Sequence, residues 1–163
     1  MEFRSRDDDG GSASDHAVVI VVGNATEMRG SGYWMVEYRA GRPNRFSAQT
    51  LGCYLDIAVA FSTVFENPLN RDDATAILFV DRNGGSAEEL FDEQLLAAWL
   101  NFANGAVGLA DPVDTDGDGA SDRTFGEALL AAENVRKDPL AARDQLLAHK
   151  EILERILLRD DRR

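Results

Sequence analysis

The sequence predicts an all-α domain of about five helices, packed orthogonally or as a bundle, with one acidic loop between two of them. Three observations lead to this prediction. Helix-start signals recur after residue 43, and apolar residues repeat at helical spacing over residues 47–158. A convincing strand pattern occurs only once, in residues 17–22, and a single strand cannot form a sheet without a partner.

Length and charge narrow the classes of function. The 163 residues, 44% of them hydrophobic, are enough for one globular domain with a real core. A net charge of −12 argues against nucleic acid or an anionic membrane as a partner and fits solubility, cation binding or a salty environment. The longest apolar run, residues 17–22, is far too short to span a bilayer.

The first fifteen residues are charged and rich in Gly and Ser, which predicts a disordered tail. The letters EF and RS after Met1 resemble translated restriction sites, a cloning scar, which leaves open that an export signal or upstream domains were removed. The β-branched run 17–22 predicts a short N-terminal strand, with an extended segment lying on the helices as the alternative. The predicted parts are a tail, a strand or linker, a helical domain that binds a cation, and a second tail: 1–15, 16–25, 26–158 and 159–163.

The first predicted helix contains an aromatic segment, and a longer helix follows it. A short helix over Tyr33 to Tyr38 is broken by Gly41 and Pro43, and Trp34 is expected to anchor it to the core. Ser47 is a helix N-cap, and the helix that follows is expected to run to about residue 66. That helix is apolar over most of its surface, which predicts a central position in the fold and a buried Cys53, the only cysteine.

The next helices are a short one near residues 72–82 and a longer one that begins at Ser86. Glu89 follows Ser86 by three residues, which is a capping box. The longer helix ends near Gly105, and its apolar residues predict one buried face: Leu95, Ala98, Trp99, Phe102 and Ala103.

The last two helices follow the acidic loop. Thr124 and Glu127 form a second capping box, which predicts a helix start directly after the loop. Asp138 followed by Pro139 resembles a cap with proline at the first helical position, so the last helix is expected to run from there to about residue 158.

The acidic loop, DPVDTDGDGASDRTFGE over residues 111–127, holds five aspartates and a glutamate. Numbered from the second aspartate, four carboxylates and one main-chain carbonyl fall at positions 1, 3, 5, 9 and 7: Asp114, Asp116, Asp118, Asp122 and Ala120. Gly119 at position 6 permits the sharp turn that brings these oxygens to one point. Carboxylates held this close repel one another without a cation, so the spacing predicts a site for a hard, oxygen-seeking ion.

The stretch DTDGDGASD resembles the calcium loops of EF-hands, dockerins and thrombospondin type 3 repeats over 12 to 14 residues. The resemblance implies one bound Ca²⁺, for which a lanthanide could substitute, whereas Mg²⁺ suits the loop less well. Position 12, a bidentate glutamate in an EF-hand, is Phe125 here. Glu127 is the candidate to replace it, with its helix-capping role as the alternative, and Asp111 is a weaker candidate.

Over residues 26–158 the order of helices and calcium loop resembles the helical C-terminal modules of large secreted or surface proteins of bacteria and archaea. That resemblance implies an extracellular or cell-surface location, no established reaction, and as partners either other domains of a larger surface protein or a separate protein. A dockerin carries two loop–helix segments and this chain carries one, so cohesin binding does not follow.

The alternative function is a calcium-dependent, hydrolase-like enzyme domain with a cleft near Trp34, Tyr38 and Trp99. The sequence assigns no catalytic residue to it. It contains no Walker loop, G-x-S-x-G motif or zinc cysteine set, and neither His16 nor His149 has the spacing of a triad or a metal-ligand pair.

Overall fold

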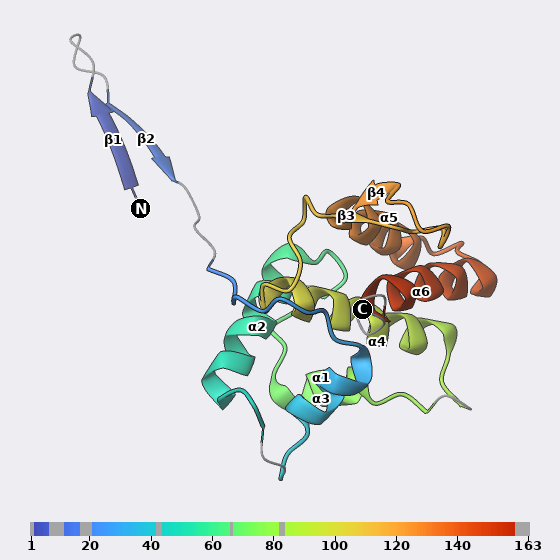
Figure 1. The fold of residues 1–163 in the computed structure, drawn as a ribbon. Helices are drawn as coiled ribbons and strands as arrows, with labels where there is room; N and C mark the ends of the chain where they lie inside the picture. The colour runs from blue at the N-terminus through green and yellow to red at the C-terminus, as the bar shows by residue number, and fades with distance from the viewer. Residues whose placement is uncertain are drawn as a thin grey trace.

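The computed structural model describes residues 2–6, 12–16, 21–41, 44–65, 67–81 and 84–158. Over this part of the chain the fold is all-α, as the sequence predicts, with six helices where about five were expected (Figure 1). The helices are α1 Ser31–Tyr38, α2 Ala48–Phe61, α3 Arg71–Leu78, α4 Ala87–Ala103, α5 Phe125–Lys137 and α6 Arg143–Leu158.

Two short antiparallel strand pairs complete the described elements. β1 Glu2–Arg6 pairs with β2 Ser12–His16, where the sequence analysis expected no strand. The residues between them are DDDGG in the sequence, a composition that favours turns. β3 Pro112–Val113 pairs with β4 Arg123–Thr124 at the two ends of the acidic loop.

The strand predicted over residues 17–22 lies partly outside the described residues, which resume at Val21. Val21 and Val22 belong to no strand, and the chain from there runs extended along the end of α4. Main-chain N–H groups of Gly23 and Ala25 donate to the carbonyl oxygens of Ala103 and Asn104, at 2.9 and 3.0 Å. The contact with α4 thus begins after the predicted run, at Gly23, and Val21 and Val22 themselves are exposed.

α4 is the central helix of the fold, not α2 as the sequence analysis expected. Every residue from 93 to 103 is buried, because α4 packs against the five other helices. In α2 only Leu51, Tyr54, Leu55 and Ala58 are buried, and Cys53 is exposed, which corrects its predicted burial. The prediction failed because α2 carries apolar residues on several faces. Hydrophobicity alone does not say which of these faces packs against another helix.

The helix starts follow the predicted caps. The Ser47 hydroxyl accepts a hydrogen bond from the Thr50 N–H at 3.1 Å, and both predicted capping boxes, at the starts of α4 and α5, are formed. A third box, Asn70 with Asp73, opens α3 and was not predicted. These side chains satisfy main-chain N–H groups that have no partner inside the helix.

α4 and α6 end close to their predicted ends, at Ala103 and Leu158, whereas α2 ends early because of a buried carboxylate on another helix. α2 ends at Phe61, several residues early, because Ser62 and Thr63 turn toward Glu133 of α5. The Glu133 carboxylate accepts hydrogen bonds from the Ser62 hydroxyl at 2.6 Å, the Thr63 N–H and hydroxyl at 3.1 and 2.9 Å, and the Trp99 indole N–H at 3.0 Å. Four donors on α4 and on the turn after α2 thus compensate the burial of this charge.

The predicted start of α6 is also wrong. Asp138 is the C-cap of α5, and its carboxylate accepts a hydrogen bond from the Leu140 N–H at 2.9 Å, which shapes a turn that includes Pro139. α6 begins only at Arg143, with the Gln145 side chain accepting from the Ala142 N–H at 2.8 Å. An aspartate before a proline serves equally well in a turn and at a cap, so the sequence signal was ambiguous.

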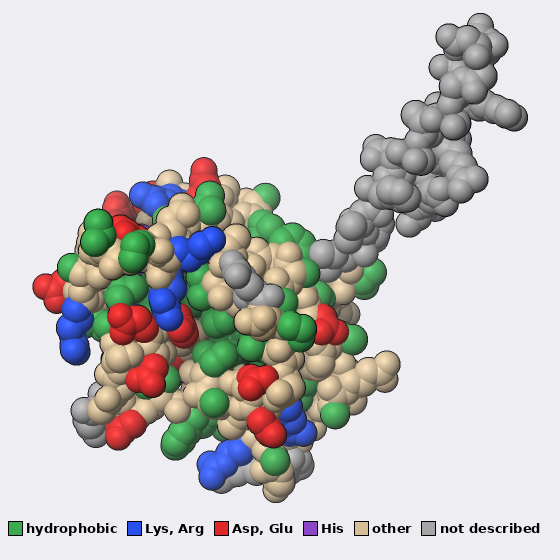
Figure 2. Space-filling view, turned by 180° about the vertical axis from the view of Figure 1, so that it is seen from behind, with side chains coloured by type: hydrophobic (Ala, Val, Ile, Leu, Met, Phe, Trp, Pro, Cys, Tyr) green, Lys and Arg blue, Asp and Glu red, His purple; other side chains and the backbone are tan. Residues whose placement is uncertain are grey.

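On the face seen in Figure 2, apolar side chains reach the surface between scattered acidic and basic ones. None of the described helices is both long enough and apolar enough to cross a membrane.

Candidate metal centre

The acidic loop is closed at its neck by the β3–β4 pair, in which Val113 lies opposite Arg123. The Asp122 N–H donates to the Val113 carbonyl at 3.0 Å, and the Phe125 N–H donates to the Asp111 carbonyl at 2.8 Å. Because Phe125 is also the first residue of α5 and fully buried, the neck is attached to the helical core. The loop ends are therefore fixed in place.

Asp114 organises the turn inside the loop. Its carboxylate is buried and accepts hydrogen bonds from the N–H groups of Gly117 and Gly119, at 2.6 and 2.9 Å. Both glycines have positive φ, +86° and +98°, a backbone conformation that residues with a Cβ adopt only with strain. The two glycines of the motif therefore serve the fold of the loop directly.

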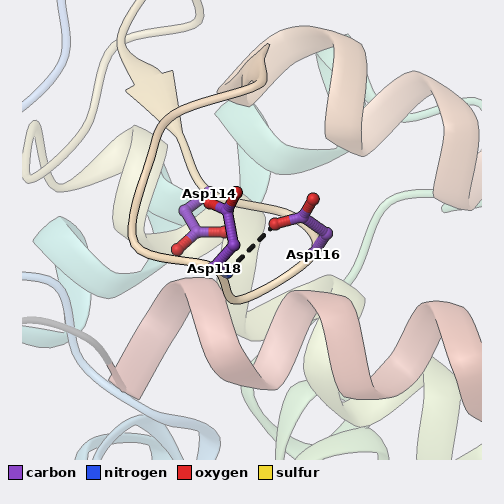
Figure 3. A group of neighbouring side chains, drawn as sticks. All are labelled: Asp114, Asp116 and Asp118. Atoms are coloured by element: carbon purple, nitrogen blue, oxygen red, sulfur yellow. Dashed lines mark hydrogen bonds between the residues drawn. The ribbon is translucent and has the colours of Figure 1, made fainter.

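This turn brings three carboxylates together. One oxygen from each of Asp114, Asp116 and Asp118 lies within 4.8 Å of the other two, and Figure 3 shows all three arising from the same turn of chain. Oxygens bound to one calcium ion at 2.3–2.6 Å are at most about 5 Å apart, twice that distance. The spacing of the three oxygens is compatible with a single shared metal ion.

Two further predicted ligands, Asp122 and Ala120, make hydrogen bonds within the loop. Both oxygens of Asp122 accept from Thr115, one from its N–H at 2.7 Å and one from its hydroxyl at 2.6 Å, and these bonds lower the pKa of the Asp122 carboxyl. The N–H of Ala120 donates to Asp118 at 2.8 Å. Asp122 and Ala120 thus brace the loop around the three clustered aspartates.

Glu127 acts as a helix cap in this structure. One of its carboxylate oxygens accepts from the Thr124 N–H and hydroxyl, at 2.8 and 2.9 Å, which lowers the pKa of Glu127. Asp111, the weaker candidate on the entry side, accepts from the Gly108 N–H at 2.7 Å. Neither carboxylate belongs to the cluster of three.

Arg155 of α6, which no sequence pattern indicated, contacts the loop. Its Nη1 donates to the Thr115 carbonyl oxygen at 2.6 Å, and a Cβ added to Gly117 would lie 3.1 Å from its Nε. The guanidinium therefore lies against the main chain of the acidic turn. The two residues are 40 positions apart, and an arginine in the last turn of a helix is too common to indicate this contact.

The aromatic residues of the enzyme alternative belong to the buried core. Trp34 and Tyr38 are completely buried and Trp99 is 5% exposed. The Tyr38 hydroxyl donates to the Leu51 carbonyl at 2.9 Å, and burial raises the pKa of Tyr38 far above its usual value, which unsuits it for proton transfer near neutral pH. Burial and the charge of Arg123 lower the pKa of His149.

Searches of protein-family models, curated proteins and solved structures found no match for this chain.

Proposed function

We propose that this chain is a calcium-stabilised structural or interaction module of an extracellular or cell-surface protein. The observation that carries the proposal is the convergence of Asp114, Asp116 and Asp118 at one point of a loop anchored to the core. Three adjacent negative charges in one short loop are unfavourable alone and become favourable when a divalent cation lies between them.

The chemistry of the donors favours calcium over other metals. The converging atoms are carboxylate oxygens, with no imidazole or thiolate in the cluster, which suits a hard cation. Calcium accepts six to eight oxygens in irregular geometry, so main-chain carbonyls and water can complete its shell, whereas Mg²⁺ requires a near-ideal octahedron. In the proposed complex the Ala120 carbonyl and Asp122 supply further oxygens, and Glu127 remains with its helix cap.

Weak affinity is expected, and this is the basis for the proposed location. Position 12 lacks the bidentate glutamate, and Asp122 must share or release its bonds to Thr115 in order to reach the ion. Loops of extracellular modules bind calcium with Kd of about 10⁻⁴–10⁻³ M, which external calcium saturates and resting cytosolic calcium does not. A module of this affinity is fully stabilised only outside the cytoplasm.

The test is isothermal titration calorimetry of chelator-stripped protein with CaCl₂, alongside terbium luminescence as a second readout. About one site per chain with a Kd of about 10⁻⁴–10⁻³ M is expected, and Asp116→Asn should remove it. The matched control is Asp56→Asn on α2, an exposed aspartate outside the loop, which should bind like the wild type. Absence of heat and of terbium emission would reject the metal site, and a nanomolar Kd would reject the extracellular assignment.

A further inference from the structure

Phe79 is a large aromatic side chain that the fold leaves in solvent. It follows the last residue of α3, held there by a hydrogen bond from its N–H to the Thr75 carbonyl at 3.0 Å. Its side chain is 66% exposed, whereas its neighbour Leu78 is 2% exposed and lies in the core. Exposing an aromatic ring is unfavourable, and such rings commonly serve as anchors of protein interfaces.

Two hollows flank the ring. One, of about 460 Å³, lies between α3 and the start of α4, and the other, of about 390 Å³, lies between α3 and α1. Apolar side chains form much of both walls, and Phe79 and Ala76 border both hollows. We call this area the Phe79 surface, defined by Met35, Ala76, Ile77, Phe79 and Val80.

The rim of the Phe79 surface is acidic. Among the described residues, Asp72 and Glu89 border the hollows together with a single basic residue, Arg39. A further carboxylate on the rim, Asp92, is matched by Arg136 of α5, whose Nε and Nη2 donate to it at 2.7 and 2.9 Å. The uneven balance of charge favours a partner that carries positive charge around an apolar centre.

A second copy of this chain does not meet that requirement. Each copy carries a net charge of −12, so two Phe79 surfaces brought face to face would place like charges opposite one another. The complementary partner is a segment of another protein with one or two bulky apolar side chains, sized for the hollows, flanked by Lys or Arg.

We propose that the Phe79 surface is the docking site for such a basic, apolar segment of a partner protein. The proposal deepens the interaction role proposed above but is physically separate from the metal site. In Figure 1, α1 and α3 lie on one side of α4, and the β3–β4 loop lies on the other. Docking on one side and calcium binding on the other can therefore be measured independently.

The experiment is selection from a phage-displayed random peptide library against the wild-type chain in calcium. Enriched peptides should combine an aromatic or branched aliphatic residue with Lys or Arg. For a fluorescein-labelled copy of the best peptide, Phe79→Ala should weaken binding tenfold or more, and Glu89→Gln, which can still cap α4, should weaken it several-fold. Binding should also weaken as NaCl rises, because salt screens the rim charges.

The matched control is Leu140→Ala, which removes an exposed apolar side chain outside the Phe79 surface and should leave peptide affinity unchanged. Phe79→Ala and Leu140→Ala both change exposed residues, and the melting curves of the two variants establish that they fold. The proposal fails if no peptide is enriched, if enriched peptides are acidic, or if they bind Phe79→Ala as well as the wild type. Self-association in sedimentation that Phe79→Ala abolishes would also overturn it, because the occupant would then be a second copy.

The same peptide titration in chelator separates the two proposals. Peptide binding without any calcium binding would reject the metal site and retain the docking surface. Calcium binding without any selected peptide would retain the metal site and reject the docking surface.

Discussion

The substitution Asp116→Asn should reverse its effect on stability when calcium is added. Asparagine keeps the side-chain oxygen that accepts the Asp118 N–H at 3.0 Å, so the local turn is retained. It removes one of three negative charges from the cluster. In chelator this relieves repulsion, and in calcium it removes a charged ligand, so the variant is expected to be the more stable protein without calcium and the less stable one with it.

The size of both effects follows from the geometry. The three oxygens lie within 4.8 Å of one another. Two unit charges at that separation repel by about 0.9 kcal/mol in water, so removing one of three relieves about 2 kcal/mol before screening by salt. Calcium at a hundredfold excess over Kd stabilises the wild type by about 2.7 kcal/mol. For a domain of this size 1 kcal/mol shifts Tm by roughly 2–4 °C. In chelator the variant should melt a few degrees higher. In calcium it forgoes about 2.7 kcal/mol but keeps the relief of about 2 kcal/mol, so it should be less stable by about 0.7 kcal/mol and melt about 1–3 °C lower.

The assay is thermal unfolding followed by circular dichroism, in EDTA and in millimolar CaCl₂, for the wild type, Asp116→Asn and the Asp56→Asn control. The control should follow the wild type in both buffers. The reasoning is refuted if calcium leaves the wild-type Tm unchanged, if both loop proteins gain equally from calcium, or if the variant is the less stable one in EDTA. A variant less stable in EDTA would mean that the carboxylates do not repel one another measurably in the folded loop.

Three further predictions concern the helical core and its pH dependence. Glu133→Gln replaces a carboxylate oxygen that accepts hydrogen bonds from buried donors with an amide NH₂ group, which donates. The variant should be less stable by about 3 kcal/mol in urea unfolding. A loss below about 1 kcal/mol would show that the four hydrogen bonds are not formed in solution. Gly105→Ala should destabilise the domain by more than Gly41→Ala. Both glycines have positive φ, but only the methyl group added at 105 meets another group, the Gly23 carbonyl oxygen at 1.9 Å. Equal losses of stability would contradict the packing of the segment around Gly23 on α4. The pKa of His149 is lower in the folded state than the unfolded value of 6.5. Its contribution to stability is therefore complete above that pH and declines as pH falls below it. His149→Asn should flatten this part of the stability–pH curve, and an unchanged slope would contradict this prediction.

The starts of α2, α4 and α5 were predictable because they depend on a few neighbouring residues. Ser47, Ser86 and Thr124 each accept a hydrogen bond from an N–H three residues on, and that spacing is visible in the sequence. The end of α2 was not predictable, because it depends on a distant contact. The end of α2 is set by Glu133, 71 residues from Ser62, and no local pattern announces that partner.

In the candidate site too, the features set by neighbouring residues were predictable, and those set by distant contacts were not. The converging carboxylates lie within five residues, from Asp114 to Asp118, so spacing and the two glycines sufficed to predict that they meet. The bonds between Thr115 and Asp122 needed the closure of the neck by β3 and β4, strands of two residues that are too short to leave a pattern. The position of the loop on α6 needed the packing of the whole domain.

The contact with Arg155 bears on how strongly one cation can act on the fold. Its guanidinium already places a positive charge against the acidic turn, so part of the repulsion between the aspartates is offset before any metal binds. That offset lowers the gain from a cation and is a second physical reason, beside the residue at position 12, to expect weak affinity. The same contact joins the loop to α6, while Phe125 joins it to α5 and the core. A metal that rigidified the loop would therefore act at the point where α5 and α6 are both attached, and through these two helices it would stabilise the rest of the domain.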